Sequence, residues 1–176
     1  MKKIFKPEQV GELLQGWLLH AHKGRDRHDE ASRRLNRNRT ALGIGTIVFS
    51  ALAGLSSVVV EPLPSSWRPW VSLSISICGF TAALLASIQT FLRYEERIEQ
   101  HHLAGARYKN TIRALEQVMI APHSESLVTH QWLDDFRRSL DKLDSESPVV
   151  PRKVYDRIEG RFIKAQPVTH AFDLYN

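Results

Sequence analysis

Apolar residues gather into two long blocks that a short proline-rich segment separates. The first block covers residues 40–60 and begins TALGIGTIVFSALAG; the second covers 70–92 and reads WVSLSISICGFTAALLASIQTFL. A hydrocarbon layer about 30 Å thick needs roughly 20 helical residues, and both blocks reach that length without a charged side chain. The alternative is two buried helices of a soluble core, but these are usually shorter and keep a polar face. We therefore expect two membrane-spanning helices.

Positive charge is distributed unevenly around the two blocks. Residues 1–40 hold ten lysines and arginines, four of them in RRLNRNR (33–39), whereas the connecting segment EPLPSSWRP (61–69) holds only Arg68. Because lysine and arginine accumulate on the cytoplasmic side, both termini are expected in the cytoplasm and the connection outside. A nucleic-acid patch is the alternative use of RRLNRNR, but its place beside a span already accounts for the charges. No nucleic acid is expected as a partner.

The flanking segments show helical periodicity. Residues 10–21 carry one apolar stripe at i, i+3, i+4 and i+7 spacing, formed by Val10, Leu13, Leu14, Trp17, Leu18 and Ala21. The basic stretch that follows is expected to continue as helix into the first span. After the second block, a heptad-like seam predicts contact with another helix, including one of a neighbouring subunit. The seam consists of Tyr94, Ile98, His101, Gly105, Tyr108, Ile112 and Leu115.

Two further helices are predicted towards the C-terminus. One begins at Ser124 and directs Leu127, Trp132, Phe136, Leu140 and Leu143 inward. The segment SESPVVP (145–151) ends it, because proline and serine clusters interrupt helices. A last short helix is lined by Tyr155, Ile158 and Phe162.

The predicted fold class is therefore all-α, a two-helix transmembrane hairpin with cytoplasmic N- and C-terminal helices. We expect a cytoplasmic amphipathic region over 1–39, the hairpin over 40–92 with spans 40–60 and 70–92, a cytoplasmic helical region over 93–165, and a tail over 166–176. The expected location is the cell inner membrane, crossed more than once. The 24 basic and 19 acidic residues give the 176-residue chain a formal charge of +5. Beyond residue 92 the charges balance, so no second basic surface is expected.

The sequence contains little that indicates catalysis. It lacks a glycine-rich phosphate loop, a serine nucleophile elbow and a cysteine–histidine metal pattern. His20, His22 and His28 precede the first block, and His101 and His102 follow the second. Adjacent residues on a helix point about 100° apart, so these pairs are not expected to converge on a metal ion. We predict no enzyme, no catalytic residue, no metal and no cofactor.

Small and weakly polar residues recur at helical spacing within both blocks. In the second block they are Ser72, Ser76, Gly79, Ala83, Ser87 and Thr90, with Gln89 near the inner end; in the first they are Thr46, Ser50, Gly54 and Ser57. Small residues let helices approach closely in lipid, and a hydroxyl bonds back to the carbonyl at i−4. These faces either pack the hairpin or line a weakly selective pore built from several hairpins, with Gln89 as a constriction. Both interpretations stay open from the sequence.

The order of these features is similar to that of a known family. A tryptophan-bearing N-terminal helix, a basic stretch and two spans precede HHLAGARYKNTIRALE (101–116) and SPVVPRKVY (147–155). Over residues 10–160 this order resembles the SLATT domains of bacteria, and the resemblance assigns the hairpin and the helix that contains His102, Ala106 and Tyr108 to the family pattern, so that His102 and Ala106 join the seam residues. The resemblance implies an oligomeric two-span effector of prokaryotic conflict and anti-phage systems that forms pores. It also implies that a separately encoded sensor or nucleotide-signalling protein activates the effector.

A membrane-anchored adaptor is the second function that the sequence supports. In that case the hairpin holds cytoplasmic helices at the membrane, and these helices, with Trp132 and Phe136, bind a protein partner without forming a pore. The membrane potential under activation distinguishes the two functions. A lipid-modifying enzyme lacks a candidate set of catalytic residues.

Overall fold

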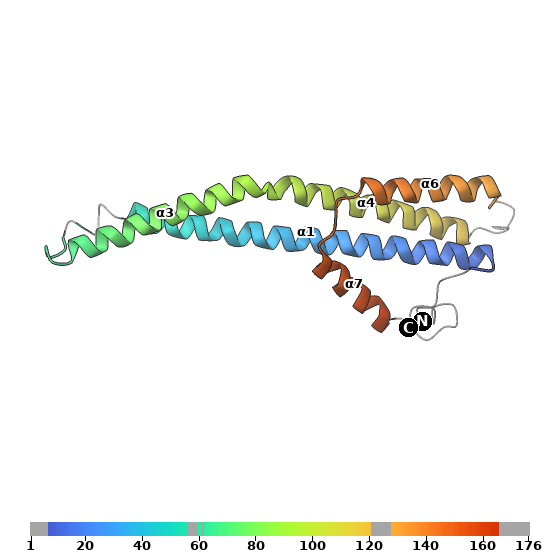
Figure 1. Cartoon of the computed structure of the whole chain (residues 1–176), viewed down its shortest axis with the longest axis horizontal. Helices are drawn as coiled ribbons and strands as arrows, with labels where there is room; N and C mark the ends of the chain where they lie inside the picture. The colour runs from blue at the N-terminus through green and yellow to red at the C-terminus, as the bar shows by residue number, and fades with distance from the viewer. Residues whose placement is uncertain (1–6, 56–59, 61, 121–127, 166–176) are drawn as a thin grey trace. The chain divides into compact units, whose positions relative to one another are not determined.

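The computed structural model describes residues 7–55, 60, 62–120 and 128–165, and these residues are helical with short connections, as predicted. Figure 1 shows the helices α1 (Val10–Gly54), α3 (Arg68–Leu92), α4 (Tyr94–Ile120), α6 (His130–Glu146) and α7 (Arg152–Ala165). The chain divides into two compact units. Unit 1 comprises Met1–Ser32 and Glu99–Asn176, and unit 2 comprises Arg33–Ile98.

The helix α1 runs without interruption from the amphipathic N-terminal segment into the first apolar block, as expected. Leu14 and Ala21 of its predicted stripe are buried, and Leu18 packs against a buried cluster, whereas Val10 is exposed. The predicted span over 40–60 is described as helix up to Gly54. Residues 56–59, among them Ser57, lie outside the described residues.

The helix α3 begins at Arg68, slightly before the predicted start, because Pro69 fits the first helical turn. It ends at Leu92, where Arg93 adopts a left-handed conformation with φ 44° and ψ 49°. The chain continues as helix from Tyr94, in α4, after this single residue. The left-handed region of φ and ψ is unfavourable for residues other than glycine. At Arg93 it marks a defined break between α3 and α4.

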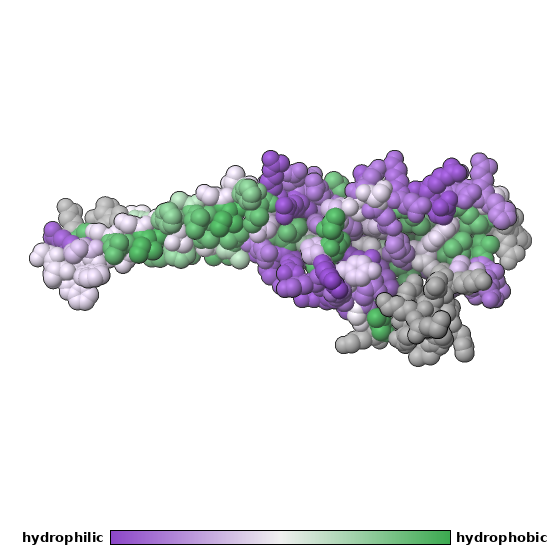
Figure 2. Space-filling view, in the orientation of Figure 1, coloured by the Kyte–Doolittle hydropathy of each residue, from purple (hydrophilic) through white to green (hydrophobic). Residues whose placement is uncertain are grey.

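One helical stretch among the described residues is long and apolar enough to cross a membrane. It belongs to the helical run Arg68–Ile120, and only 6% of it is buried. A core helix of a soluble protein is mostly buried, whereas here hydrophobic side chains line much of the visible face of the two helices in unit 2 (Figure 2). The described residues therefore support membrane association through the second block.

Unit 1 has a small core in two clusters. The first joins Ala21 of α1, Tyr108 and Ile112 of α4, and Leu143 of α6; the second joins Ala31 of α1 to Val154 and Ile158 of α7. The predicted seam of α4 therefore contacts other helices, but within the same chain. His101, Tyr108, Ile112 and Leu115 are buried in these contacts. The use of the seam as a contact between subunits stays a prediction.

The C-terminal helices partly follow the predicted pattern. The helix α6 begins at His130, where the Thr129 hydroxyl caps the first turn by accepting a hydrogen bond from the Trp132 N–H at 3.2 Å. The predicted start at Ser124 and Leu127 lies outside the described residues. In α7, Val154 takes the buried position expected for Tyr155, which is 44% exposed. The guanidinium of Arg27 lies over the Tyr155 ring, 3.9 Å from its centroid, so a cation–π contact replaces core packing.

Candidate functional site

Within unit 2, α1 and α3 run side by side in opposite directions. A Cβ added at Gly43 would lie 3.3 Å from Gln89 Nε2, and one at Gly45 would lie 3.2 Å from Leu85 Cδ1. Further along α1, Ala53 faces Gly79. As the residue number rises on α1 it falls on α3, which defines a helical hairpin. Glycine at these positions allows the close backbone approach that apolar helices use in lipid.

The surface of α3 divides into three faces with different chemistry. The face towards α1 is buried or half-buried and has heptad spacing, with Val71, Ile75, Cys78, Ala82, Leu85, Gln89 and Leu92. A second face is exposed and small or hydroxylated, with Ser72, Ser76, Ala83, Ser87 and Thr90. A third is exposed and bulky, with Leu73, Ile77, Phe80, Leu84, Ile88 and Phe91. At about 100° of rotation per residue, these faces are centred about 100–140° apart.

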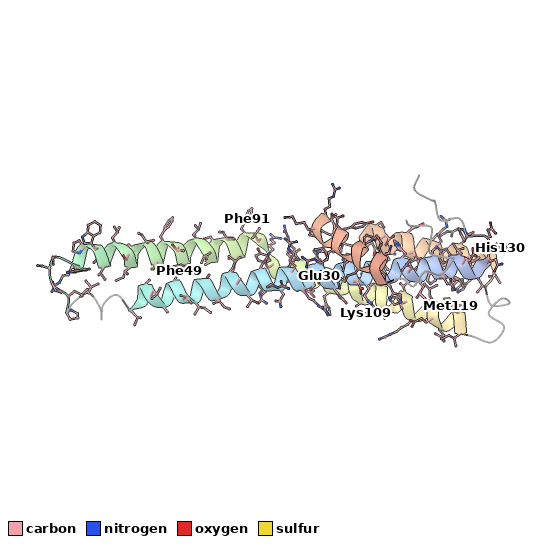
Figure 3. The ribbon with its side chains drawn as sticks, turned by 90° about the horizontal axis from the view of Figure 1, so that it is seen from below. Glu30, Phe49, Phe91, Lys109, Met119 and His130 are labelled. Carbon is pink, nitrogen blue, oxygen red and sulfur yellow. The ribbon has the colours of Figure 1, made fainter. Side chains whose placement is uncertain are left out.

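The hydroxyl face of α3 is thus not consumed by packing against α1. Of the predicted residues, Gly79 lies at the border of that contact, and the remaining ones on this face are exposed. Phe91, on the bulky face, points away from α1 and is 85% exposed (Figure 3). The sequence left open whether the hairpin itself covers the small polar groups. The structure shows that, in a single chain, α1 covers a different side of α3.

The hydroxyl groups of α3 bond back to their own helix, as predicted. Ser76 Oγ donates to the Ser72 carbonyl at 2.9 Å, and Ser87 Oγ donates to the Ala83 carbonyl at 2.8 Å. Ser74, Thr81 and Thr90 make equivalent bonds. Each hydroxyl proton is satisfied within the helix, while the oxygen keeps a lone pair for an external donor.

The small and polar residues that were predicted to share one face of the first block differ in their burial. Thr46 is half-buried on the side of α1 that faces α3 and donates its hydroxyl to the Leu42 carbonyl at 2.9 Å. Ser50 and Gly54 are exposed. Ser57 lies outside the described residues. A pattern of residue types alone does not show which part of an apolar helix meets its neighbour.

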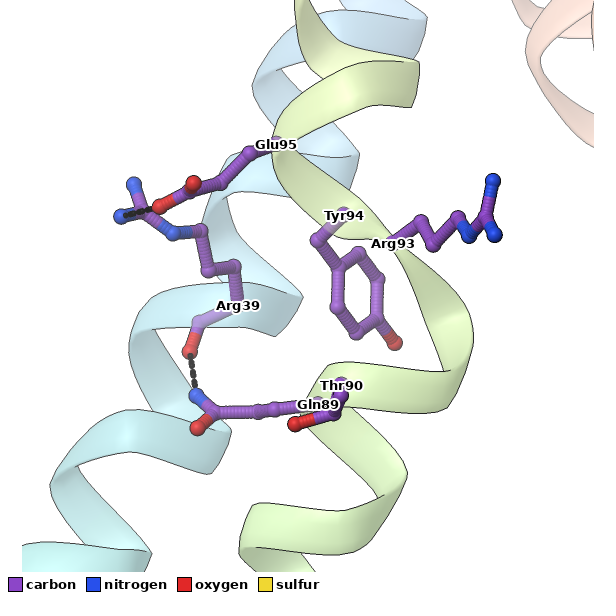
Figure 4. Close-up of a pocket in the computed structure, with 6 residues that line it drawn as sticks. All are labelled: Arg39, Gln89, Thr90, Arg93, Tyr94 and Glu95. Atoms are coloured by element: carbon purple, nitrogen blue, oxygen red, sulfur yellow. Dashed lines mark hydrogen bonds and ion pairs between the residues drawn. The ribbon is translucent and has the colours of Figure 1, made fainter.

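Gln89, the predicted pore constriction, lies at the contact between α3 and α1. Its Nε2 donates to the Arg39 carbonyl of α1 at 3.1 Å, and the Arg39 guanidinium forms an ion pair with Glu95 (Figure 4). These two contacts join the helices at the charged end of the hairpin. They border an open pocket of about 360 Å³ that Thr90, Arg93 and Tyr94 also line.

A second polar assembly lies in unit 1, between α1, α4 and α6. The Nδ1 atoms of His28 and His101 lie 2.9 Å apart, and the His28 ring stacks on Tyr108 with centroids 5.6 Å apart. The Tyr108 hydroxyl donates to Asp144, whose other oxygen lies 2.9 Å from His20 Nε2. One Nδ1 must donate and the other accept, so the two buried imidazoles hold opposite tautomers.

Burial and mutual contacts shift the acidities of this assembly. Burial, and then the neighbouring His101, lower the pKa of His28 to about 4, and burial lowers the pKa of His101. Burial and the hydrogen bond to Asp144 raise the pKa of Tyr108. Burial also raises the pKa of Asp144, but hydrogen bonds from His20 and Tyr108 outweigh it and leave that pKa lowered. At neutral pH the histidine pair is uncharged and Asp144 is ionised.

Two glycines allow α1 and α4 to approach closely around these rings. A Cβ at Gly24 would lie 2.5 Å from Tyr108 Cε1, and one at Gly105 would lie 2.8 Å from Asp29 Oδ1. Both distances are shorter than van der Waals contact, so a side chain at either position would displace its neighbour. Gly105 belonged to the predicted seam, but nothing in the sequence singled out Gly24.

The sequence did not reveal that His28 and His101 meet. They are 73 positions apart, and only the heptad position of His101 hinted at an inward side chain. His102, which the resemblance added to the seam, is exposed, whereas Ile98 and Ala106 are half-buried. Within the described ranges, no three histidine, cysteine or acidic side chains group as metal ligands would.

Comparisons of the chain with protein-family models, with curated proteins and with solved structures find no match. The function must therefore be inferred from the chain's own residues. Three features of them matter most: the uncovered hydroxyl face of α3, the charged end of the hairpin, and the polar assembly in unit 1.

Proposed function

We propose that this chain is a two-span effector of the inner membrane that oligomerises and permeabilises the bilayer in a bacterial anti-phage or conflict system. The observation that carries the proposal is the uncovered hydroxyl face of α3. Ser72, Ser76 and Ser87 remain exposed after α1 has packed against the helix. Polar groups at membrane depth are tolerated best against protein or water, so this face favours another copy or a water-filled path over acyl chains.

The proposed topology places both termini in the cytoplasm and the connection after α1 outside. The second block supplies one span, and the first block supplies the other over residues 40–60. Two features support this topology: the antiparallel contact of α1 with α3, and the arginines that flank their common end. Arg68 is the one basic residue of the connection, and the aromatic rings of Trp67 and of Trp70, where the second block begins, suit a membrane interface.

Several copies are needed, because two helices cannot enclose water. In the proposed assembly the bulky face with Phe80 and Phe91 contacts lipid, and the hydroxyl face contacts the neighbouring copy or lines the conduit. Gln89 is not the constriction in this arrangement, since its amide joins α3 to α1. Such a conduit carries no charged ring and selects weakly among ions.

The trigger is proposed to come from a separate protein, a sensor or nucleotide-signalling partner that acts on unit 1. The SLATT resemblance supports this part of the proposal. We further propose that the chain is not an enzyme and uses no cofactor. Its polar assembly around His28 and Asp144 is engaged in internal hydrogen bonds, which suits a structural role.

The test compares dye entry into cells that produce the wild type and single variants. Ser76→Leu and Ser87→Leu should each reduce dye entry, and the double variant should abolish it, because leucine removes the acceptor oxygens and fills the face. The matched control is Ser74→Leu. Ser74 makes the same i−4 bond and is exposed, but it lies on the opposite side of α3 from Ser72. Undiminished dye entry in a fully inserted double variant contradicts the conduit.

An adaptor without a pore is the second candidate, and one observation favours it. The rings of Trp17 and Trp132 stack on either side of Phe136, with centroids 5.4 and 5.0 Å apart, and all three remain partly exposed. Large aromatic rings at a surface are typical of binding interfaces. An intact membrane potential under full activation, with a partner whose co-purification is lost in Trp132→Ala, would favour the adaptor.

A further inference from the structure

The two units differ in how their arginines are neutralised. In unit 1 every described arginine except Arg113 forms an ion pair, namely Arg25, Arg27, Arg107, Arg137, Arg138, Arg152, Arg157 and Arg161. In unit 2, Arg39 pairs with Glu95 and Arg93 with Glu96. Four exposed arginines of unit 2, here called the arginine belt, make no ion pair with any described residue. They are Arg33, Arg34, Arg37 and Arg97.

The belt lies beside the end of the apolar hairpin. On α1, Arg33, Arg34 and Arg37 fall within an arc of about 100°, so they share one side of the helix. Along the axis, Arg37 lies about 4.5 Å and Arg33 about 10 Å from Thr40, where the apolar block begins. The polar headgroup layer is about 5–8 Å thick on each side of a bilayer. Long arginine side chains on these positions reach that layer.

The first turn of α4, which follows the second helix of the hairpin, contributes a cation at the same end. Glu95, in the first turn of α4, pairs with Arg39 of α1, and Arg97 follows two residues later. Carboxylates are present at this end, but Glu95 and Glu96 are engaged by Arg39 and Arg93. Residues 33–39 and 93–97 together hold six arginines and two glutamates, an excess of four positive charges. No acidic side chain among the described residues pairs with the belt, so an external anion is a suitable partner for it.

We propose that the arginine belt binds the phosphate groups of anionic phospholipids at the cytoplasmic membrane surface. The inference rests on the proposed membrane insertion. A guanidinium presents two parallel N–H donors that match two phosphate oxygens, and it sheds water more readily than an ammonium does. Each basic residue near an anionic surface contributes about five-fold in affinity. The three arginines on α1 together then give a preference of about 100-fold for anionic over zwitterionic lipid.

A nucleic-acid backbone offers the same phosphate chemistry, but the position of the belt favours lipid. The described residues of unit 1 neutralise most of their own cations, so they offer no continuation of a basic surface. No aromatic side chain is interleaved with the belt on α1 to stack on bases. A belt limited to the end of an apolar hairpin suits a planar layer of headgroups.

The experiment uses the full chain in detergent and counts bound lipids by native mass spectrometry. Phosphatidylglycerol and phosphatidylcholine with identical acyl chains are titrated separately. The wild type should retain phosphatidylglycerol preferentially, and the triple variant Arg33→Gln/Arg34→Gln/Arg37→Gln should lose most of that preference. The control is Arg137→Gln/Arg138→Gln/Arg152→Gln, which removes the same charge from exposed, ion-paired positions and should behave like the wild type.

Two added ligands distinguish binding of lipid phosphate from binding of a free phosphate or of a nucleic-acid backbone. Glycerol 3-phosphate at millimolar concentration should not displace the lipid, and displacement would show that a free phosphate is the ligand. A 20-base-pair DNA duplex should bind the wild type and the belt variant equally weakly, and tight binding lost only in the belt variant would overturn the lipid assignment. Equal retention of both lipids by the wild type would also overturn it. Extraction with alkaline carbonate, applied to membranes of cells that produce the chain, reports insertion separately. Release of the chain from these membranes would count against the proposed function.

Discussion

His28 and His101 place their Nδ1 atoms 2.9 Å apart in the buried contact between α1 and α4. Each ring is neutral there, because burial disfavours the imidazolium and each charge would repel the other. The groups that act on the pair are Tyr108, the cation Arg27, and the carboxylates Asp29 and Asp144. The stability of unit 1 should therefore depend on pH through this pair.

Acidification should destabilise unit 1 through this pair. An unfolded histidine binds a proton near pH 6.5, whereas folded His28 does so only near pH 4, so the unfolded state binds more protons in between. Stability should be full above pH 6.5, fall as the pH drops through this window, and reach its lower level near pH 4. His101→Gln should reduce that pH dependence, whereas His102→Gln at the exposed neighbouring position should leave it unchanged. Thermal unfolding between pH 7.5 and 4 measures it, and an identical pH profile in all three proteins would contradict the assignment.

Gly24→Ala should destabilise unit 1 by about 1–3 kcal/mol, the usual cost of overpacking. The added Cβ would lie 2.5 Å from the ring of Tyr108, which is buried and cannot swing away. Gly160→Ala in α7 is the matched control, because nothing lies within 4 Å of its Cβ. That change should raise stability by about 0.5–1 kcal/mol, since alanine favours a helix interior. Denaturant unfolding compares them, and a neutral Gly24→Ala would show that the close contact is absent.

Glu159→Gln should loosen α7 from α1. Glu159 accepts from Lys23 at 2.9 Å and from Arg27, and both cations are largely buried. The variant removes the negative charge that two largely buried cations share, at a cost of about 1–3 kcal/mol. Hydrogen exchange should become faster in α7 and remain unchanged in α6. Asp156→Gln is the control, because its pair with Arg152 is exposed and long, at 3.9 Å.

Cysteine crosslinking should separate contacts between copies from contacts within the hairpin. With native Cys78 replaced by serine, Ala83→Cys on the hydroxyl face should give disulfide-linked dimers in oxidised membranes. Gly45→Cys together with Leu85→Cys should instead close a bond within one chain, because these positions face each other. Non-reducing gels separate the products. Monomeric Ala83→Cys under activating conditions would count against assembly through this face.

Much of the helical layout followed from periodicity. The stripe ending at Ala21, the buried positions Leu140 and Leu143, and the i−4 bonds of the serines follow from local rules of helix geometry. The exposure of His102 and the burial of Val154 in place of Tyr155 did not follow. A heptad pattern tolerates a shift of one position, and only the neighbouring helix decides which side chain is enclosed.

The sequence by itself determined the helices and the two apolar blocks, because these depend on hydrophobic period, length and charge placement within short segments. Only the tertiary structure decided that α1 covers one side of α3 and leaves its hydroxyls uncovered, and that His28 meets His101. Those outcomes depend on the rotation of one helix about its axis against another. That rotation is set by close contacts such as Gly45 with Leu85 and Gly24 with Tyr108, between residues far apart in the chain.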